Sequence, residues 1–206
     1  MIRHPLDLAY DQATALLVID VQNDFADPGG SLAVGGGDAI IPFLNDQIGA
    51  ARRAGALVAY TQDWHPAVTP HFARDGGIWP VHCVMDTWGA EFHPNLLVDG
   101  PSVHKGSAGE DGYSGFRMRD PTTGQESATE LDAILRSAGI KQAVVVGLAT
   151  DYCVQASALD SVRLGYQTRV LLAGVRAVDL APGDGDRALT AMVAAGVALV
   201  GREVRR

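Results

Sequence analysis

Residues 14–21 read TALLVIDV, a short apolar run that ends in an acidic residue and a valine. Apolar side chains at consecutive positions, rather than at alternate ones, indicate a strand that is buried on both faces, as strands of parallel sheets are. Comparable runs follow along the chain. The further strands expected from them are residues 57–61, 102–105, 143–148, 169–172 and 197–200.

Helical patterns separate these strands. An apolar stripe over residues 39–54 is typical of an amphipathic helix, and later helices are expected to end at Ala138, Leu164 and Ala195. The residues expected to cap helix starts are Asp38, Ser127 with Glu130 in a capping box, and Asp151. The last helix is expected to begin at Asp184 or Asp186. The alternation predicts an α/β fold, a single three-layer α/β/α domain over residues 1–206 with a six-stranded, mainly parallel sheet.

Composition narrows the class of protein. Of the 206 residues, 47% are hydrophobic and 19% are charged, which is the balance of a globular chain with a sizeable core. Asp and Glu number 24 against 16 Lys and Arg, so nucleic acid is not expected as a partner. The opening MIRHPLDLAYDQ lacks the apolar stretch of a signal peptide, and no run approaches the about 18 apolar residues of a membrane span. We expect a soluble, cytoplasmic protein with no membrane partner.

Reactive side chains collect where the expected strands end. Asp20 ends the first strand, Asp63 and His65 follow the second, Lys105 ends the third, and Cys153 follows the fourth. The carboxyl ends of parallel strands meet at one edge of a sheet, which is where ligand sites of α/β proteins lie. The sequence therefore predicts a functional site at this edge.

Cys153 lies at the expected strand-to-helix turn in GLATDYC, residues 147–153. The free N–H groups and the dipole of a helix start would lower the pKa of its thiol and favour a nucleophilic thiolate. The alternative is a small buried side chain that packs the helix. Asp20 and Lys105 favour the interpretation of Cys153 as a nucleophile, because a carboxylate at the end of a central strand needs a partner. The alternative that the Lys105 side chain extends into solvent stays open. The other cysteine, Cys83, forms no CxxC pair and is interpreted as structural.

A second group of candidates consists of one carboxylate and three imidazoles near the long loop over residues 62–100. Its members are Asp63, His65, His71 and His82. Such a set suits zinc, ferrous iron or manganese better than calcium or magnesium. Alternate residues of an extended segment point to the same side, so Asp63 and His65 can bind one ion together. A loop that is rich in histidine by chance is the alternative.

Several short motifs occur in order along the chain. They are VIDVQNDF at residues 18–25, GGSLAV at 29–34, TQDWHP at 61–66, WPVHC at 79–83, VHKG at 103–106, YSGF at 113–116 and GLATDYCV at 147–154. Together they resemble the nicotinamidase/pyrazinamidase family of isochorismatase-like cysteine hydrolases. The resemblance implies hydrolysis of nicotinamide to nicotinate and ammonia in NAD salvage, acceptance of pyrazinamide, and the isochorismatase-like hydrolase fold.

The resemblance also implies roles for single residues. The catalytic triad would be Asp20, Lys105 and Cys153, and the ligands of one divalent transition-metal ion (zinc, iron or manganese) would be Asp63, His65, His71 and His82. The substrate-binding residues implied are Phe25, Trp79, Tyr113 and Ala149. The backbone N–H groups of Ala149 and Cys153 resemble the family's oxyanion hole, with a cis peptide bond expected between Leu148 and Ala149.

Two features depart from the family pattern. Tyr152 stands where many bacterial relatives carry His or Thr, and residues 106–112 form a longer segment than in the short bacterial members.

The alternatives to a nicotinamidase are another amidase of the same superfamily, or a catalytically silent relative that binds a metal or a metabolite. The sequence leaves open which metal is bound and the oligomeric state, a homo-oligomer included.

Overall fold

The computed structural model describes residues 10–201. A parallel six-stranded sheet runs through its centre in the order β3-β2-β1-β6-β7-β8. The strands are β1 (Thr14–Ile19), β2 (Leu57–Asp63), β3 (Ser102–Lys105), β6 (Gln142–Leu148), β7 (Gln167–Arg176) and β8 (Ala198–Val200). All six expected strands are confirmed, and β1 is buried along its whole length because it lies in the middle of the sheet.

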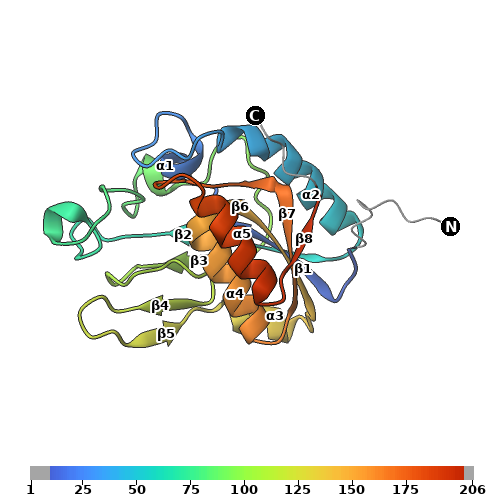
Figure 1. Cartoon of the computed structure of the whole chain (residues 1–206). Coiled ribbons are helices and arrows are strands. Elements are labelled where there is room, and N and C mark those ends of the chain that lie inside the picture. Colours follow the sequence, from blue (N-terminus) through green and yellow to red (C-terminus); the bar gives the residue numbers. More distant parts are fainter. Residues whose placement is uncertain (1–9, 202–206) are drawn as a thin grey trace.

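Helices cover both faces of this sheet (Figure 1). They are α2 (Ile41–Arg53) on one face and α3 (Leu131–Ser137), α4 (Gln155–Arg163) and α5 (Asp184–Ala194) on the other. Alternate residues of β1 divide between the two layers: Leu16 and Val18 pack in the core beneath α2, whereas Leu17 and Ile19 pack in the core beneath the other three helices. The three-layer α/β/α architecture is therefore as predicted.

The connections contain short elements that position side chains. These are α1 (Asn23–Ala26), the 3₁₀ turns η1 (Asp38–Ile40), η2 (Ala73–Asp75) and η3 (Trp88–Ala90), and the π-helical turn η4 (Thr150–Val154). An antiparallel pair, β4 (Arg117–Arg119) and β5 (Glu126–Ala128), projects beside the sheet (Figure 1). No strand was predicted there, because strands of three residues carry no readable period.

The predicted capping box at Ser127 and Glu130 is wrong. Ser127 is an exposed residue of β5, paired with Met118, so its side chain is not at the start of α3. The hydroxyl oxygen of Thr129 instead accepts a hydrogen bond from the backbone N–H of Leu131 at 3.2 Å. Because Ser127 belongs to the β4–β5 hairpin, helix α3 begins after the position that the capping-box spacing predicted.

Two further predicted caps are also wrong. Asp38 lies inside η1 rather than before a helix, and no side-chain hydrogen bond caps that turn. Asp151 lies inside η4, where its carboxylate accepts backbone N–H groups from Val178 at 2.9 Å and Asp179 at 2.8 Å. Asp151 therefore fastens the segment after β7 to the turn that carries Cys153.

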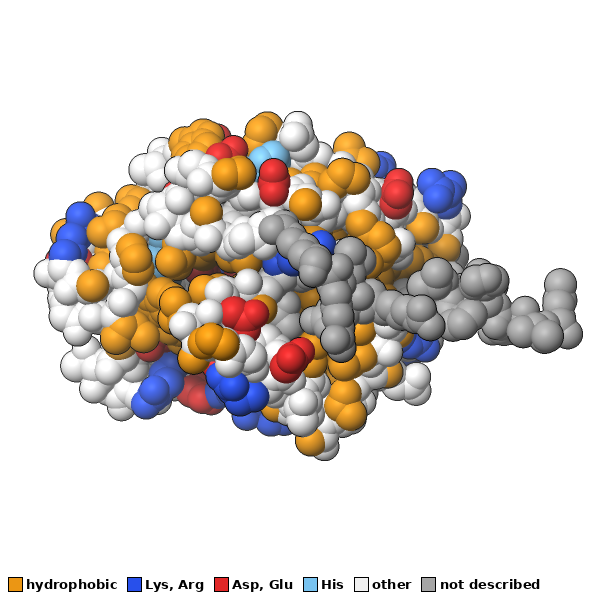
Figure 2. All heavy atoms as spheres, turned by 45° about the horizontal axis from the view of Figure 1, so that its top comes forward, with side chains coloured by type: hydrophobic (Ala, Val, Ile, Leu, Met, Phe, Trp, Pro, Cys, Tyr) orange, Lys and Arg blue, Asp and Glu red, His pale blue; other side chains and the backbone are white. Residues whose placement is uncertain are grey.

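On the face in Figure 2, basic side chains lie singly or in small groups among acidic and apolar ones. Within residues 10–201, every helix is too short or too polar to cross a lipid bilayer.

Candidate active site

The carboxyl ends of the central strands bring the predicted residues together. Asp63 is paired in register with Lys105 across β2 and β3, and Asp20 follows β1, with its backbone N–H donating to Thr61 at 3.2 Å. Asp20 has φ of 49°, a left-handed conformation that costs energy for a residue other than glycine and turns the chain sharply at the strand end. Cys153 enters the same space from η4.

Lys105 is the centre of a buried charge cluster. Its Nζ lies 2.8 Å from Asp20 Oδ2 and 3.8 Å from Cys153 Sγ, and it also donates to Asp63 Oδ1 and to the Gly112 carbonyl. The sulfur and one oxygen of each carboxylate all lie within 4.8 Å of one another. Because the Lys105 side chain is 0% exposed, the solvated alternative is excluded.

Burial and this cluster set the ionisation of its members. Burial raises the pKa of Asp20 above its usual value despite the opposing charge of Lys105. Burial also opposes ionisation of Asp63, but Lys105 and His65 outweigh it and hold the pKa of Asp63 below its usual range. Burial lowers the pKa of Lys105, yet the two carboxylates more than compensate and leave that pKa well above the ordinary value. Lys105 is thus a fixed cation, and Asp20 is the carboxylate more ready to accept a proton.

The expected lowering of the Cys153 pKa by a helix start is wrong. Burial raises the pKa of its thiol well above the ordinary value, and the carboxylates of Asp20 and Asp63 add to this, while Lys105 opposes it. Cys153 is also enclosed in a π-helical turn rather than at the open first turn of a long helix. The resting sulfur therefore carries its proton and needs an adjacent base.

Three histidines converge beside this cluster. One nitrogen from each of His65, His71 and His82 lies within 4.8 Å of the others. Asp63 Oδ2 lies 3.7 Å from His65 Nε2 and 3.8 Å from His82 Nε2. Asp63 therefore uses one oxygen for Lys105 and turns the other toward the histidines, which links the two predicted constellations.

The chemistry of these donors fits a divalent transition metal. Within residues 10–201, the two buried ring nitrogens of His65 have no hydrogen-bond partner, which is costly unless another group satisfies one of them. Burial lowers the pKa of His71, and it lowers the pKa of His82 to about 4, so both rings are neutral at pH 7 and able to bind metal. His82 Nδ1 donates to the Pro80 carbonyl at 2.7 Å, which leaves Nε2 for the ion.

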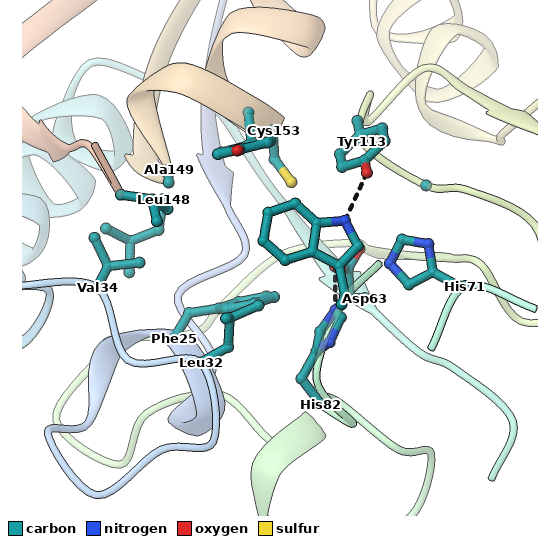
Figure 3. Close-up of a pocket in the computed structure, with 14 residues that line it drawn as sticks. Phe25, Leu32, Val34, Asp63, His71, His82, Tyr113, Leu148, Ala149 and Cys153 are labelled. Atoms are coloured by element: carbon teal, nitrogen blue, oxygen red, sulfur yellow. Dashed lines mark hydrogen bonds and ion pairs between the residues drawn. The ribbon is translucent and has the colours of Figure 1, made fainter. Parts of the chain in front are cut away.

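A largely apolar cavity of about 480 Å³, its open mouth included, lies between these groups. Residues on its wall include the four predicted substrate-binding residues, namely Phe25, Trp79, Tyr113 and Ala149. Figure 3 shows the sulfur of Cys153 directed into this space, with Phe25, Leu32 and Val34 toward one side and His71 toward the other. A lining of apolar and aromatic side chains with a few polar groups is typical of small-molecule sites.

Aromatic side chains of the cavity wall contact one another. Trp79 Nε1 donates to the Tyr113 hydroxyl at 2.7 Å, and the Trp79 ring meets Tyr152 edge-on at a centroid distance of 5.0 Å. Tyr152 thus joins the wall. The peptide bond between Leu148 and Ala149 is cis, as expected from the resemblance.

The sequence patterns did not indicate several residues that hold the site together. Gln22 holds the backbone of Asp63 through its amide, donating to the carbonyl at 2.7 Å and accepting from the N–H at 2.8 Å. Thr61 donates to Asp20 Oδ1 at 2.6 Å, and Asp111 contacts His71. Pairing of β1 with β2 could have pointed to Thr61, but no local pattern distinguishes Gln22 or Asp111 from ordinary polar loop residues.

Known proteins resemble this chain in sequence and in fold. The isochorismatase domain model matches residues 14–203. The nicotinamidase of Escherichia coli K12 is 38% identical over 203 residues, covering 90% of this chain and 93% of the relative. The zinc complex of Pyrococcus horikoshii pyrazinamidase has a TM-score of 0.82 at 39% identity, covering 92% of this chain and 99% of that one. PnC1 of L. infantum with nicotinate has a TM-score of 0.86 at 31% identity, covering 95% and 96%. The chain therefore belongs to the isochorismatase family.

Proposed function

We propose that this protein is a nicotinamidase, which hydrolyses nicotinamide to nicotinate and ammonia in NAD salvage and also accepts pyrazinamide. The observation that carries the proposal is the position of Cys153 Sγ, 3.8 Å from Lys105 Nζ and on the wall of a cavity that His71 and His82 also line. The cavity has aromatic walls and is bordered by a thiol, a buried base and a set of metal-binding side chains, which suits a ring that bears a carboxamide. The nicotinamidase and pyrazinamidase relatives support this substrate class.

The proposed chemistry is acyl transfer through Cys153. Asp20 accepts the thiol proton while the sulfur attacks the carboxamide carbon, and Lys105 stabilises the resulting negative charges. Backbone N–H groups of Ala149 and Cys153 hold the oxyanion. Asp20 then gives its proton to the departing ammonia, and the same carboxylate activates the water that hydrolyses the thioester and releases nicotinate.

Asp63, His65, His71 and His82 would hold the divalent metal ion. When bound, the ion supplies a position for the ring nitrogen of the substrate, directly or through water, and so orients the carboxamide toward the sulfur. The donor set suits zinc, ferrous iron or manganese. The zinc complex of the Pyrococcus horikoshii relative supports an ion of this kind.

Ammonia release from nicotinamide and from benzamide tests this proposal. Benzamide has the carboxamide but no ring nitrogen, so we expect its kcat/KM to be lower by about 100-fold or more. Removal of the metal with a chelator should reduce the rate on nicotinamide much more than the rate on benzamide, and added metal should restore it. Equal kcat/KM for the two amides would contradict the orienting role. If the protein releases ammonia from N-carbamoylsarcosine but not from nicotinamide, it is another amidase of the family. If it releases ammonia from neither amide, it is a catalytically silent relative.

Cys83 provides a matched control for the nucleophile. It is 0% exposed, its backbone N–H donates to Asp24 Oδ2 at 2.7 Å, and its thiol lies 3.7 Å from the Gly89 carbonyl. Cys83→Ala should cost about 1–2 kcal/mol in the free energy of unfolding through lost packing, with kcat nearly unchanged. Urea unfolding and ammonia release measure the two effects. Loss of activity with normal metal content would show that the wrong thiol had been assigned.

We further propose one domain over residues 1–206 that acts in the cytoplasm on a small-molecule substrate. The family match over residues 14–203 supports the single domain. Both cysteines are free thiols, which is usual in a reducing compartment. The ends of the proposed domain lie outside the described residues.

A further inference from the structure

We propose that Asp111 is a positioning residue of the metal centre, which fixes the tautomer and direction of His71. The inference rests on the proposed metal site and hence on the proposed function. Asp111 Oδ1 lies 2.7 Å from His71 Nδ1. A carboxylate only accepts hydrogen bonds, so Nδ1 carries the proton and Nε2 keeps the lone pair that a metal requires.

The surroundings make this contact specific. The His71 side chain is 5% exposed and the Asp111 side chain is 26% exposed, so the pair lies at the boundary between the cavity and solvent. A carboxylate at this boundary thus holds the ring by a charge-assisted hydrogen bond, while the other ring nitrogen serves the histidine cluster.

The backbone holds Asp111 in place from both sides. Its N–H donates to the Arg119 carbonyl at 2.7 Å and its carbonyl accepts from the Arg119 N–H at 2.9 Å, which ties it to β4. The next residue, Gly112, accepts a hydrogen bond from Lys105 Nζ. The carboxylate is therefore carried by a segment that is anchored both to the hairpin and to the catalytic cluster.

The other end of the same segment touches a second histidine. Gly106 has φ of 74°, and a Cβ added there would lie 2.5 Å from His65 Cε1 and 2.6 Å from His65 Nδ1. Only glycine allows this close approach. Residues 106–112 thus contact His65 at one end and His71 at the other.

Zinc affinity, measured by competition with a chromogenic chelator, tests the inference. Asp111→Ala should bind zinc about 10–100-fold more weakly than the wild type. Asp111→Asn should lose less, because its amide oxygen can still accept from Nδ1 but without the charge. Glu110→Gln is the matched control, because it removes the charge of the neighbouring residue, whose carboxylate accepts a hydrogen bond from the Ala108 N–H and not from His71. This variant should bind zinc as the wild type does. Thermal unfolding of the metal-free proteins should be alike for Asp111→Asn and Glu110→Gln.

A glycine pair gives a second, independent measurement. Gly106 and Gly109 both have positive φ, so alanine strains the backbone at either, but only at Gly106 does the new methyl meet a histidine; at Gly109 the nearest atom is 3.5 Å away. Gly106→Ala should weaken zinc binding and Gly109→Ala should not.

The outcomes separate this inference from the proposed function. Unchanged zinc affinity in Asp111→Ala and Asp111→Asn, with tight binding by the wild type, would overturn the role of Asp111 and leave the metal site standing. An equal loss in Glu110→Gln would also overturn it, because general charge rather than the contact would be responsible. Failure of the wild type to bind zinc, iron or manganese would instead remove the metal site itself.

Discussion

Cys153→Ala is expected to lower kcat on nicotinamide by about a millionfold, the scale of loss when a covalent nucleophile is removed from a hydrolase. The sulfur is the atom that would form the thioester, and no other thiol lines the described cavity. The substitution removes one small, 7% exposed side chain, so folding and metal content should stay close to those of the wild type. Ammonia release, intact-protein metal analysis and urea unfolding measure these quantities.

Cys153→Ser sharpens the same prediction. Serine preserves the size of the side chain and a hydrogen-bonding proton, but its hydroxyl is much harder to ionise than a thiol, so the variant should be nearly as inactive as alanine. The active variant in this set should be Cys83→Ala. Appreciable turnover by Cys153→Ala would contradict the mechanism, whatever the metal content.

Lys105→Met is expected to have the largest effect on stability. The ammonium group lies between the carboxylates of Asp20 and Asp63, all of them buried, and methionine would leave these two acids facing each other without a cation. Breaking a buried ion pair in this way costs about 3–5 kcal/mol in the free energy of unfolding. Hydrolysis should fall by about 1000-fold as well, since the charge that stabilises the sulfur is removed. Urea unfolding and ammonia release test both effects.

Lys105→Arg separates charge from shape. It keeps the positive charge, but the guanidinium is broader than an ammonium and the site is enclosed by Asp20, Asp63, Cys153 and the Gly112 carbonyl. We therefore expect a smaller loss of stability than in the methionine variant, with kcat still strongly reduced. Near-normal kcat in either variant would show that Lys105 serves the fold and not the reaction.

The sheet could be predicted because its central strands β1, β2 and β6 are buried on both faces. Runs such as residues 14–19 and 143–148 contain consecutive apolar residues, and their alternation with helices dictates parallel pairing. The rule that sites lie at the carboxyl edge then located Asp20, Lys105 and Cys153 without any side-chain contact being known. These contacts come from strand register, which pairs Asp63 with Lys105 and which a run of consecutive apolar residues does not fix.

Features set by contacts between distant segments could not be predicted. Ser127 matches a capping box in sequence, but its pairing with Met118 in the hairpin overrides that local preference. The pKa of Cys153 depends on how deeply the thiol is buried and on two carboxylates from other strands. The contact of Asp111 with His71 joins residues 40 positions apart through a loop whose path no periodicity describes.

Rapid acid quenching during turnover, followed by intact mass measurement and peptide mapping, shows whether Cys153 forms the acyl-enzyme. With nicotinamide, we expect a transient population whose mass is raised by one nicotinoyl group in place of one hydrogen, on the peptide that contains Cys153. The adduct should be absent from Cys153→Ala and present in Cys83→Ala. Hydrolysis at the normal rate with no adduct on Cys153 in the wild type under single-turnover conditions, or an adduct on Cys83, would contradict the account.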